Sequence, residues 1–394
     1  MIEIAGYCDP KFHAVHDVFA ENFAKHGEIG AAACLNIAGQ NVVDIWAGHS
    51  DAANQHTWQE STKCVVFSCT KGATALCVHV LASRGKIELN EPVKTYWPEF
   101  AQAGKQEITV RMLLNHQSGV AAVDKPLSTT CYADWDEVVH ALETQQPYWP
   151  PGTRAGYHLL SFGWLNGELV RRVSGTSLGE FFHQEIAGPL DLDFWIGLPP
   201  DLDADIAPIL PAPPDPDNDF FKALLDTRSL QTHGLLHFGD YMSSDAGFNS
   251  TVAHRAEIGG AGGITNARGL AGMYAPLANG GRLHGVELVS EEILSLMSET
   301  ASAVEIDAML LMPTRFSLGF MKSMDNRKQA KGRRSSAVLP DTAFGHVGAG
   351  GSIGFADPAY KLSFGYAMNK MGPGLLLNER GQRLVDAVYA SLEK

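Results

Sequence analysis

Strand-like segments at both ends of the chain flank a middle that is rich in helix signals, and this order most constrains the fold. Two short apolar runs between residues 31 and 47 break at Gly39-Gln40, which is typical of a β-hairpin. Helices are predicted from Asp9-Pro10 to Gly27 and over 379–392. We therefore expect one sheet that is built from both chain ends and covered by the terminal helices. Three further strands are predicted near the end of the chain, over 316–321, 351–355 and 361–368.

The middle of the chain is predicted to form a second, mainly helical lobe over residues 91–254. The α/β lobe is then discontinuous and comprises residues 1–90 and 255–394. Within the helical lobe, residues 199–219 hold seven prolines, six aspartates and no Lys or Arg. Such a segment cannot form an interior helix or strand. It is either a lid or pocket wall, or an ordinary surface loop. Other helices are predicted over 68–84, 157–173 and 266–279.

The charge balance bears on the kinds of partner. The 394 residues include 30 Lys and Arg against 44 Asp and Glu, a formal net charge of −14. This balance disfavours binding to nucleic acid or to an anionic membrane, although a local basic patch stays possible. No run approaches the roughly 20 apolar residues of a membrane-spanning helix, and residues 1–12 do not form a secretory signal. The six cysteines form no C-x-x-C pair, so we expect reduced thiols, no metal and a cytoplasmic location.

The sharpest chemical motif is the S-x-x-K sequence Ser68-Cys69-Thr70-Lys71. It follows a strand-like run over 64–67 and opens an apolar helix, so Ser68 and Lys71 lie on one helix face. The helix N-terminus and burial both disfavour an ammonium and favour a basic amine. A serine hydroxyl beside such an amine indicates nucleophilic catalysis. The motif alone is short, and a solvated helix start is the alternative.

Further motifs resemble the serine β-lactamase-like superfamily. That superfamily contains class C β-lactamases, penicillin-binding DD-peptidases, family VIII carboxylesterases and related acyltransferases. The resemblance extends in order over nearly the whole chain. It implies an α/β fold of the α+β type, like that of serine β-lactamases and penicillin-binding proteins, with an antiparallel sheet, flanking terminal helices and an inserted helical lobe. The matching segments are Gly85-Lys86-Ile87-Glu88-Leu89, Leu113–Gly119 (LLNHQSG), Pro151-Gly152 before Tyr157, Leu165–Gly175 and Gly345-His346-Val347-Gly348.

The resemblance also implies roles for individual residues. Ser68 is similar to the acylated nucleophile and Lys71 to its base, while Tyr157 resembles the tyrosine that relays a proton to and from the leaving group. The backbone amides of Ser68 and Ala349 are implied to form the oxyanion hole. Which of Lys71 and Tyr157 holds the proton at rest is left open, because coupled groups titrate jointly. The strand that contains His346 and Gly348 is implied to bind substrate.

Two departures from the lactamase pattern favour an esterase. His346 stands where lactamase-type members carry the lysine of Lys-Thr/Ser-Gly, and Leu159 stands where they often carry the asparagine of Tyr-x-Asn. Both changes remove groups suited to amide-bearing and carboxylate-bearing β-lactams. We therefore predict a serine carboxylesterase, closest to family VIII, whose substrates are small to medium esters. We expect no cofactor, and we expect the ester substrate to be its binding partner. The alternatives are a β-lactamase or D-amino-acid peptidase, an acyltransferase, or a non-catalytic binding protein, and the oligomeric state is left open.

Some other motifs are weaker. Ser352 lies in a G-x-S-x-G pattern, but strand-like sequence follows where a nucleophile elbow needs a helix. His13 and His16 are expected on a solvated helix face, and His116 at a helix end. Glycines 259–263 complete no nucleotide-binding motif. Four aromatic residues are candidates either for an acyl-pocket wall or for the core: Tyr132, Trp135, Tyr148 and Trp149.

Overall fold

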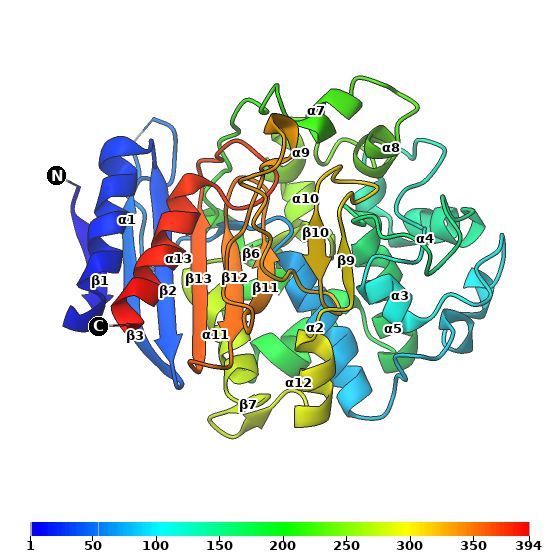
Figure 1. Cartoon of the computed structure of the whole chain (residues 1–394), viewed down its shortest axis with the longest axis horizontal. Helices are drawn as coiled ribbons and strands as arrows, with labels where there is room; N and C mark the ends of the chain where they lie inside the picture. Colours follow the sequence, from blue (N-terminus) through cyan, green and yellow to red (C-terminus); the bar gives the residue numbers. More distant parts are fainter. Residues whose placement is uncertain (1, 54, 394) are drawn as a thin grey trace.

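A six-stranded antiparallel sheet joins the two ends of the chain, as predicted (Figure 1). The structure is a computed structural model that describes residues 2–53 and 55–393. Strands β2 and β13 pair along their whole lengths, from Leu362 opposite Ile37 to Met368 opposite Ala31. This pairing brings segments more than 300 residues apart into one sheet. The strand order is β1 (Ile4–Cys8), β3 (Gln40–Gly48), β2 (Gly30–Ile37), β13 (Leu362–Met368), β12 (Ile353–Asp357) and β11 (Phe344–Val347).

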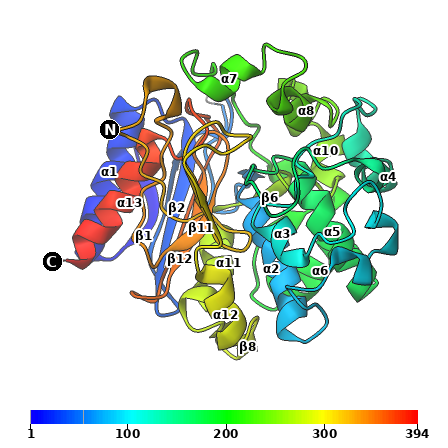
Figure 2. The same ribbon diagram turned by 45° about the vertical axis from the view of Figure 1, so that its right-hand side comes forward.

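Helices cover both faces of this sheet (Figure 2). The terminal helices α1 (His13–Lys25) and α13 (Glu379–Leu392) pack together on one face, and α11 (Ala267–Ala278) packs on the other. Side chains alternate between faces along a strand. In β2, Ala33 and Leu35 accordingly join the core beneath α1 and α13, whereas Cys34 joins the core around α11. The sequence of β2 is therefore an almost continuous apolar run, because both faces of the sheet are buried there.

The helical part of the chain is built around α2 (Thr70–Ser83), which is buried along almost its full length. A helix that is apolar on every side needs neighbours all round. α2 contacts α5 (Ser161–Ser174), α6 (Leu178–Phe182), α12 (Glu291–Ser298) and strand β11 of the main sheet. The remaining α-helices are α3 (Val110–Leu114), α4 (Trp135–Thr144), α7 (Asp219–Ala223), α8 (Leu230–Leu236), α9 (Asp245–Asn249) and α10 (Thr251–Arg255).

A three-stranded sheet lies where the helical part meets the rest of the chain. Its order is β4 (Cys64–Val65), β6 (Gly263–Thr265) and β5 (Phe194–Ile196). Strand β5 belongs to the segment predicted as the helical lobe, yet it pairs with β6 outside that segment. The lobe boundaries at 91 and 254 stay a prediction. Two two-stranded sheets complete the fold: β9 (Ser302–Val304) with β10 (Thr314–Phe316), and β7 (Arg282–Leu283) with β8 (Val286–Glu287).

The prediction of a strand over residues 316–321 is wrong. The chain turns back on itself there: the Ser317 N–H donates to the Phe320 carbonyl at 2.9 Å, and Phe316 bridges to Met321. Gly319 has a φ of +89°, which an extended strand does not contain. An apolar run that can be a strand can also be a tight turn with buried flanks. None of the helices in the described part of the chain has both the length and the apolar character needed to span a bilayer.

Candidate active site

Ser68 is presented by a strained turn between β4 and α2. Phe67, the residue before it, has a φ of +43°, which is uncommon for a residue other than glycine. The Thr70 hydroxyl donates to the Phe67 carbonyl at 2.5 Å, and the Gly263 N–H donates to the Thr70 hydroxyl at 2.8 Å. These bonds hold the turn in a conformation that costs of order 1–3 kcal/mol elsewhere. The result is a serine fixed at the start of a buried helix.

Lys71 lies one helical turn beyond Ser68 and is completely buried. Its Nζ is 3.1 Å from Ser68 Oγ and donates to the Leu159 and Gly260 carbonyls at 2.7 Å each. Burial lowers the pKa of Lys71 well below its usual value. Two of the tetrahedral positions of Nζ are directed at these carbonyls, and a third faces the Ser68 hydroxyl.

Tyr157 lies over Lys71, whose Nζ is 4.7 Å from the centre of the phenol ring. Burial raises the pKa of Tyr157, and a hydrogen bond with Ser68 acts in the opposite direction. The His346 Nδ1 donates to the Val347 carbonyl at 2.7 Å, which leaves Nε2 as an acceptor 3.4 Å from the Tyr157 hydroxyl. Burial thus disfavours the charged form of both the Lys71 amine and the Tyr157 phenol.

Two more histidines lie behind the phenol. Burial lowers the pKa of His346 to about 3 and that of His158 to about 4, and it lowers the pKa of His116 well below its usual value. His158 Nδ1 donates to the Gly156 carbonyl at 2.7 Å, so its Nε2 accepts from the Ser118 hydroxyl at 2.7 Å. His116 follows α3, as expected for a residue at a helix end, and its Nδ1 accepts the His158 N–H at 3.2 Å. The sequence motifs contained His158 and Ser118 but did not reveal this packing.

The two residues whose amides are predicted to form the oxyanion hole line the same cavity. Ser68 and Ala349 line it, and neither N–H donates to an acceptor within residues 2–53 and 55–393. Gly348 brings β11 close to the turn before Ser68, because a Cβ atom there would lie 2.2 Å from the Val66 carbonyl oxygen. His346 and Gly348 themselves do not line this cavity. Direct contact of these two residues with substrate stays a prediction.

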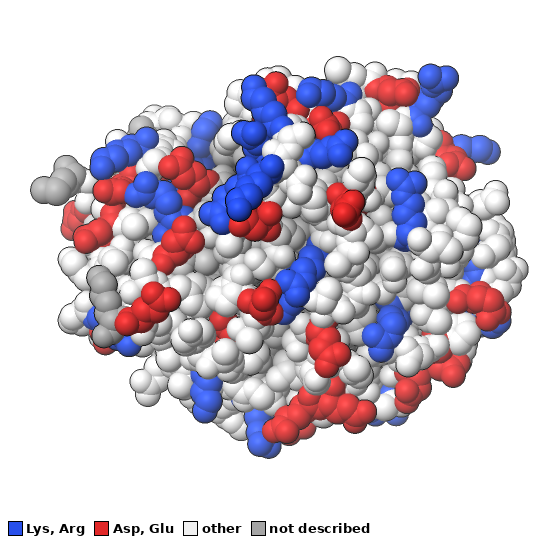
Figure 3. All heavy atoms as spheres, in the orientation of Figure 1, with Lys and Arg blue, Asp and Glu red and all other residues white. Residues whose placement is uncertain are grey.

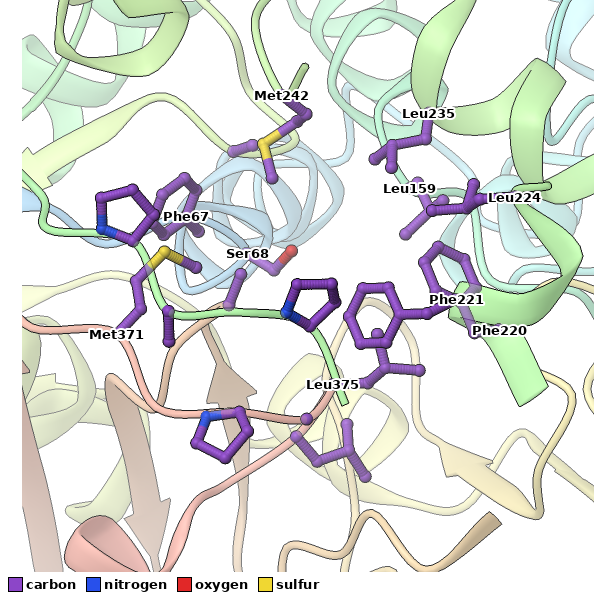
Figure 4. Close-up of a pocket in the computed structure, with 18 of the residues that line it drawn as sticks. Phe67, Ser68, Leu159, Phe220, Phe221, Leu224, Leu235, Met242, Met371 and Leu375 are labelled. Atoms are coloured by element: carbon purple, nitrogen blue, oxygen red, sulfur yellow. The ribbon is translucent and has the colours of Figure 1, made fainter. Parts of the chain in front are cut away.

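The cavity in front of Ser68 has a volume of about 470 Å³, within the range of small-molecule sites. The Ser68 hydroxyl points into it (Figure 4). Among the described residues that line it, none is Asp, Glu, Lys, Arg or His. Its wall comes from several distant segments, including Phe67 before α2, Phe221 on α7, Leu235 on α8 and Leu375 after β13.

The Pro/Asp-rich segment is a pocket wall, because Pro211, Pro213 and Pro214 line the cavity. The four aromatic residues considered for an acyl-pocket wall do not line it and belong to the packed interior and its edges. For example, Trp135 donates to the buried Glu168 carboxylate at 2.8 Å. These aromatic residues therefore lie close to Tyr157 in the sequence but do not reach the cavity.

Two of the weaker motifs lie away from the cavity. Ser352 is buried and is followed by strand β12, not by a helix, so the nucleophile-elbow geometry is missing. On the surface of α1, the ligand atoms of His13, His16 and Asp17 lie within 4.8 Å of one another. This is the group among the described residues whose spacing could hold a metal ion, and it lies on an outer helix of the main sheet.

Comparisons with known proteins agree with this site. The sequence pattern of the family described as Beta-lactamase matches residues 15–388. The chain therefore belongs to the beta-lactamase family, and it is a serine hydrolase of that fold. A relative, "Esterase/beta-lactamase LipL" of Mycobacterium tuberculosis (strain ATCC 25618 / H37Rv), is 33% identical over 384 residues, which are 95% of this chain and 85% of the relative.

Two solved structures share the fold over almost their whole length. A family VIII carboxylesterase is 36% identical with a TM-score of 0.89, and the match covers 99% of this chain and 100% of that structure. A penicillin-binding protein homolog from Caulobacter crescentus is 33% identical with a TM-score of 0.85, and the match again covers 99% and 100%. The predicted fold class and family are thereby confirmed.

Proposed function

We propose that the protein is a carboxylesterase that hydrolyses small to medium esters through an acyl-enzyme on Ser68. One observation carries the proposal: Lys71 Nζ lies 3.1 Å from Ser68 Oγ while the Leu159 and Gly260 carbonyls each accept a hydrogen bond from it. In its neutral form, which burial favours, this amine is a base aimed at the serine proton. The solved family VIII carboxylesterase and the esterase/beta-lactamase LipL support the choice of esters.

In the proposed acylation step, Ser68 Oγ attacks the ester carbonyl carbon and its proton passes to Lys71 Nζ. The carbonyl oxygen becomes an oxyanion between the Ser68 and Ala349 amides. Each donor of this kind typically stabilises the transition state by about 3 kcal/mol. Tyr157, a phenol at rest, gives its proton to the departing alkoxide and recovers one from the Lys71 ammonium. Water then attacks the acyl-enzyme by the reverse route and releases the acid.

The cavity supports uncharged acyl groups. Charged side chains of both signs are interspersed over the face seen in Figure 3, whereas the described residues that line the cavity are uncharged. A substrate that carried a carboxylate into this cavity would lose its hydration without gaining a cationic partner. Apolar acyl chains lose nothing by the same transfer and gain from burial.

The uncharged lining of the cavity also helps to rank the alternative functions. A β-lactam of the usual kind carries a carboxylate, so we expect turnover of nitrocefin to be much less efficient than that of p-nitrophenyl butyrate. Equal efficiency would favour the β-lactamase alternative. An acyltransferase would share the acyl-enzyme and differ in the incoming nucleophile, so product analysis with an added alcohol acceptor separates transfer from hydrolysis. A non-catalytic binding protein would form no covalent adduct at Ser68.

The proposal is tested by comparing Ser68→Ala with Ser352→Ala. Both remove one serine hydroxyl, but only Ser68 faces the cavity. We expect Ser68→Ala to abolish turnover of p-nitrophenyl acetate and butyrate, and Ser352→Ala to retain it. A fluorophosphonate probe with peptide mapping is expected to label Ser68 in the wild type. Full activity in Ser68→Ala, or labelling elsewhere, would reject the assignment.

A further inference from the structure

Asp307 is a buried carboxylate beside the site that the proposed chemistry leaves unused. It lies in the loop between β9 and β10, and its side chain is completely buried. Its hydrogen-bond partners in the described part of the chain are backbone N–H groups and one hydroxyl, and none of them is a Lys or Arg side chain. Burying a carboxylate without a cation is costly unless several donors satisfy it. The groups that donate hydrogen bonds to the Asp307 carboxylate therefore indicate what this residue does.

The Asp307 carboxylate is satisfied by backbone donors from two parts of the chain. It accepts the Tyr157 N–H at 2.9 Å on Oδ1 and 3.1 Å on Oδ2. Oδ1 also accepts the N–H groups of Met309 and Leu310 at 2.8 and 2.9 Å, and Oδ2 accepts the Thr314 hydroxyl at 3.2 Å. Tyr157 and Leu310 both line the cavity. One carboxylate thus joins the phenol-bearing residue to the cavity wall.

The loop that contains Asp307 is itself anchored on both sides of the cavity. The Ala308 N–H donates to the Ala155 carbonyl at 3.0 Å, two residues before Tyr157. The buried side-chain amide of Gln231 on α8 donates to the Ala308 and Met309 carbonyls at 2.9 and 2.8 Å. The loop is therefore a junction between the segment that carries the phenol and the helix that forms part of the cavity wall.

We propose that Asp307 is the positioning residue of this site: it fixes the backbone of Tyr157, and hence the phenol that protonates the leaving alcohol. The inference rests on the proposed function, because it concerns the acid step of acylation. Burial is the main cause of the raised pKa of Tyr157, and the Asp307 charge adds to it, so the proton stays on the phenol until the alkoxide departs. Asp307 does not line the cavity and forms no hydrogen bond with Ser68, so its link to the reacting atoms runs through Tyr157.

The test uses two butyrate esters that differ in their need for an acid. p-Nitrophenolate departs readily without a proton, whereas ethoxide does not, so a displaced phenol harms ethyl butyrate far more. For Asp307→Asn we expect kcat/KM to fall about 30-fold for ethyl butyrate and about 3-fold for p-nitrophenyl butyrate. Thr314→Val removes one donor to the carboxylate but keeps its charge, and it is expected to change the ratio in the same direction by a smaller factor. It also carries the test if Asp307→Asn does not fold.

Asp357→Asn is the matched control. Asp357 is an equally buried carboxylate that accepts from Thr342, Ala359 and Tyr389, none of which lines the cavity. We expect this variant to leave the ratio of the two kcat/KM values unchanged, even if it unfolds at a lower temperature. Equal losses for both esters in Asp307→Asn, or no loss, would overturn the inference while leaving the acyl-enzyme intact. An inactive wild type would instead overturn the proposed function and the inference together.

Discussion

The two sides of Ser68 have opposite chemistry. In front of it lies a cavity whose described lining residues are all uncharged. Behind it lie a buried lysine and buried histidines, held by hydrogen bonds to carbonyl and hydroxyl groups. The buried Tyr157 phenol lies between the two sides, because it contacts these groups and also lines the cavity. The front is assembled from loops and short helices, and the back from a helix, a strand and the segment before α5. Under the proposed function, the cavity selects the substrate and the buried groups break the ester bond. A residue that belongs to one side only, such as Phe221 or Lys71, can then be altered while the other side is left in place.

A change at the back is expected to have the largest effect. Lys71→Met keeps the length of the side chain and removes the base, so kcat for p-nitrophenyl butyrate should fall roughly 10³-fold. Steady-state kinetics measures the loss, and near-ultraviolet circular dichroism shows whether the core is intact. A folded Lys71→Met variant with near-normal kcat would show that the buried lysine is not the base, and would contradict the proposed division of roles between the two sides.

The pH profile sharpens the same contrast. Because burial lowers the pKa of Lys71, the neutral amine persists below the range of an ordinary lysine and is lost only when the pH falls through this lowered value. The rate should therefore fall about tenfold per pH unit on the acid side of one limb, whose midpoint lies well below 10.5.

The buried histidines should not contribute to this limb. His346 and His158, with pKa values of about 3 and about 4, stay neutral above pH 5. A pH-stat assay measures the profile without relying on the colour of nitrophenol. A midpoint near that of an exposed lysine would contradict the proposed base, and a second limb between pH 5 and 8 would show that a histidine takes part.

A change at the front is expected to have the smallest effect on rate and the clearest effect on selectivity. Phe221→Ala enlarges the wall formed by α7, so kcat/KM for p-nitrophenyl octanoate relative to butyrate should rise about fivefold. Phe23→Ala removes a similarly half-buried ring from α1, which does not line the cavity, and should leave the ratio unchanged. An unchanged ratio in Phe221→Ala would show that the acyl chain lies elsewhere.

Much of the fold could be predicted because its signals are local. The hairpin predicted between residues 31 and 47 forms with its turn at Ala38-Gly39, one residue before the predicted break at Gly39-Gln40, and the helix predicted over 379–392 spans Glu379–Leu392. That both chain ends share one sheet could be predicted from the order of the elements and from the resemblance, but the pairing of β2 with β13 could not. The strand predicted over 316–321 failed, because an apolar run does not specify whether the backbone extends or turns.

The contacts within the site were easier to predict when the two residues lie close together in the sequence. Ser68 and Lys71 lie one helical turn apart, so their spacing alone brought them together. Tyr157 was identified by resemblance, and the structure places its ring against Lys71. The carbonyls of Leu159 and Gly260 had no sequence signal, because every residue has such a group. Asp307 acts on a backbone N–H 150 residues away, and no side-chain pattern records that contact.

The main sheet also sets the moment at which the protein can become active. Ser68 belongs to the first fifth of the chain, whereas the Ala349 amide follows β11, a strand that pairs with β12 and so with the last strand, β13. The ribosome makes β11, β12 and β13 long after Ser68. Under the proposed mechanism, a nascent chain therefore carries its nucleophile without a second oxyanion-binding amide until these three strands have been made and paired.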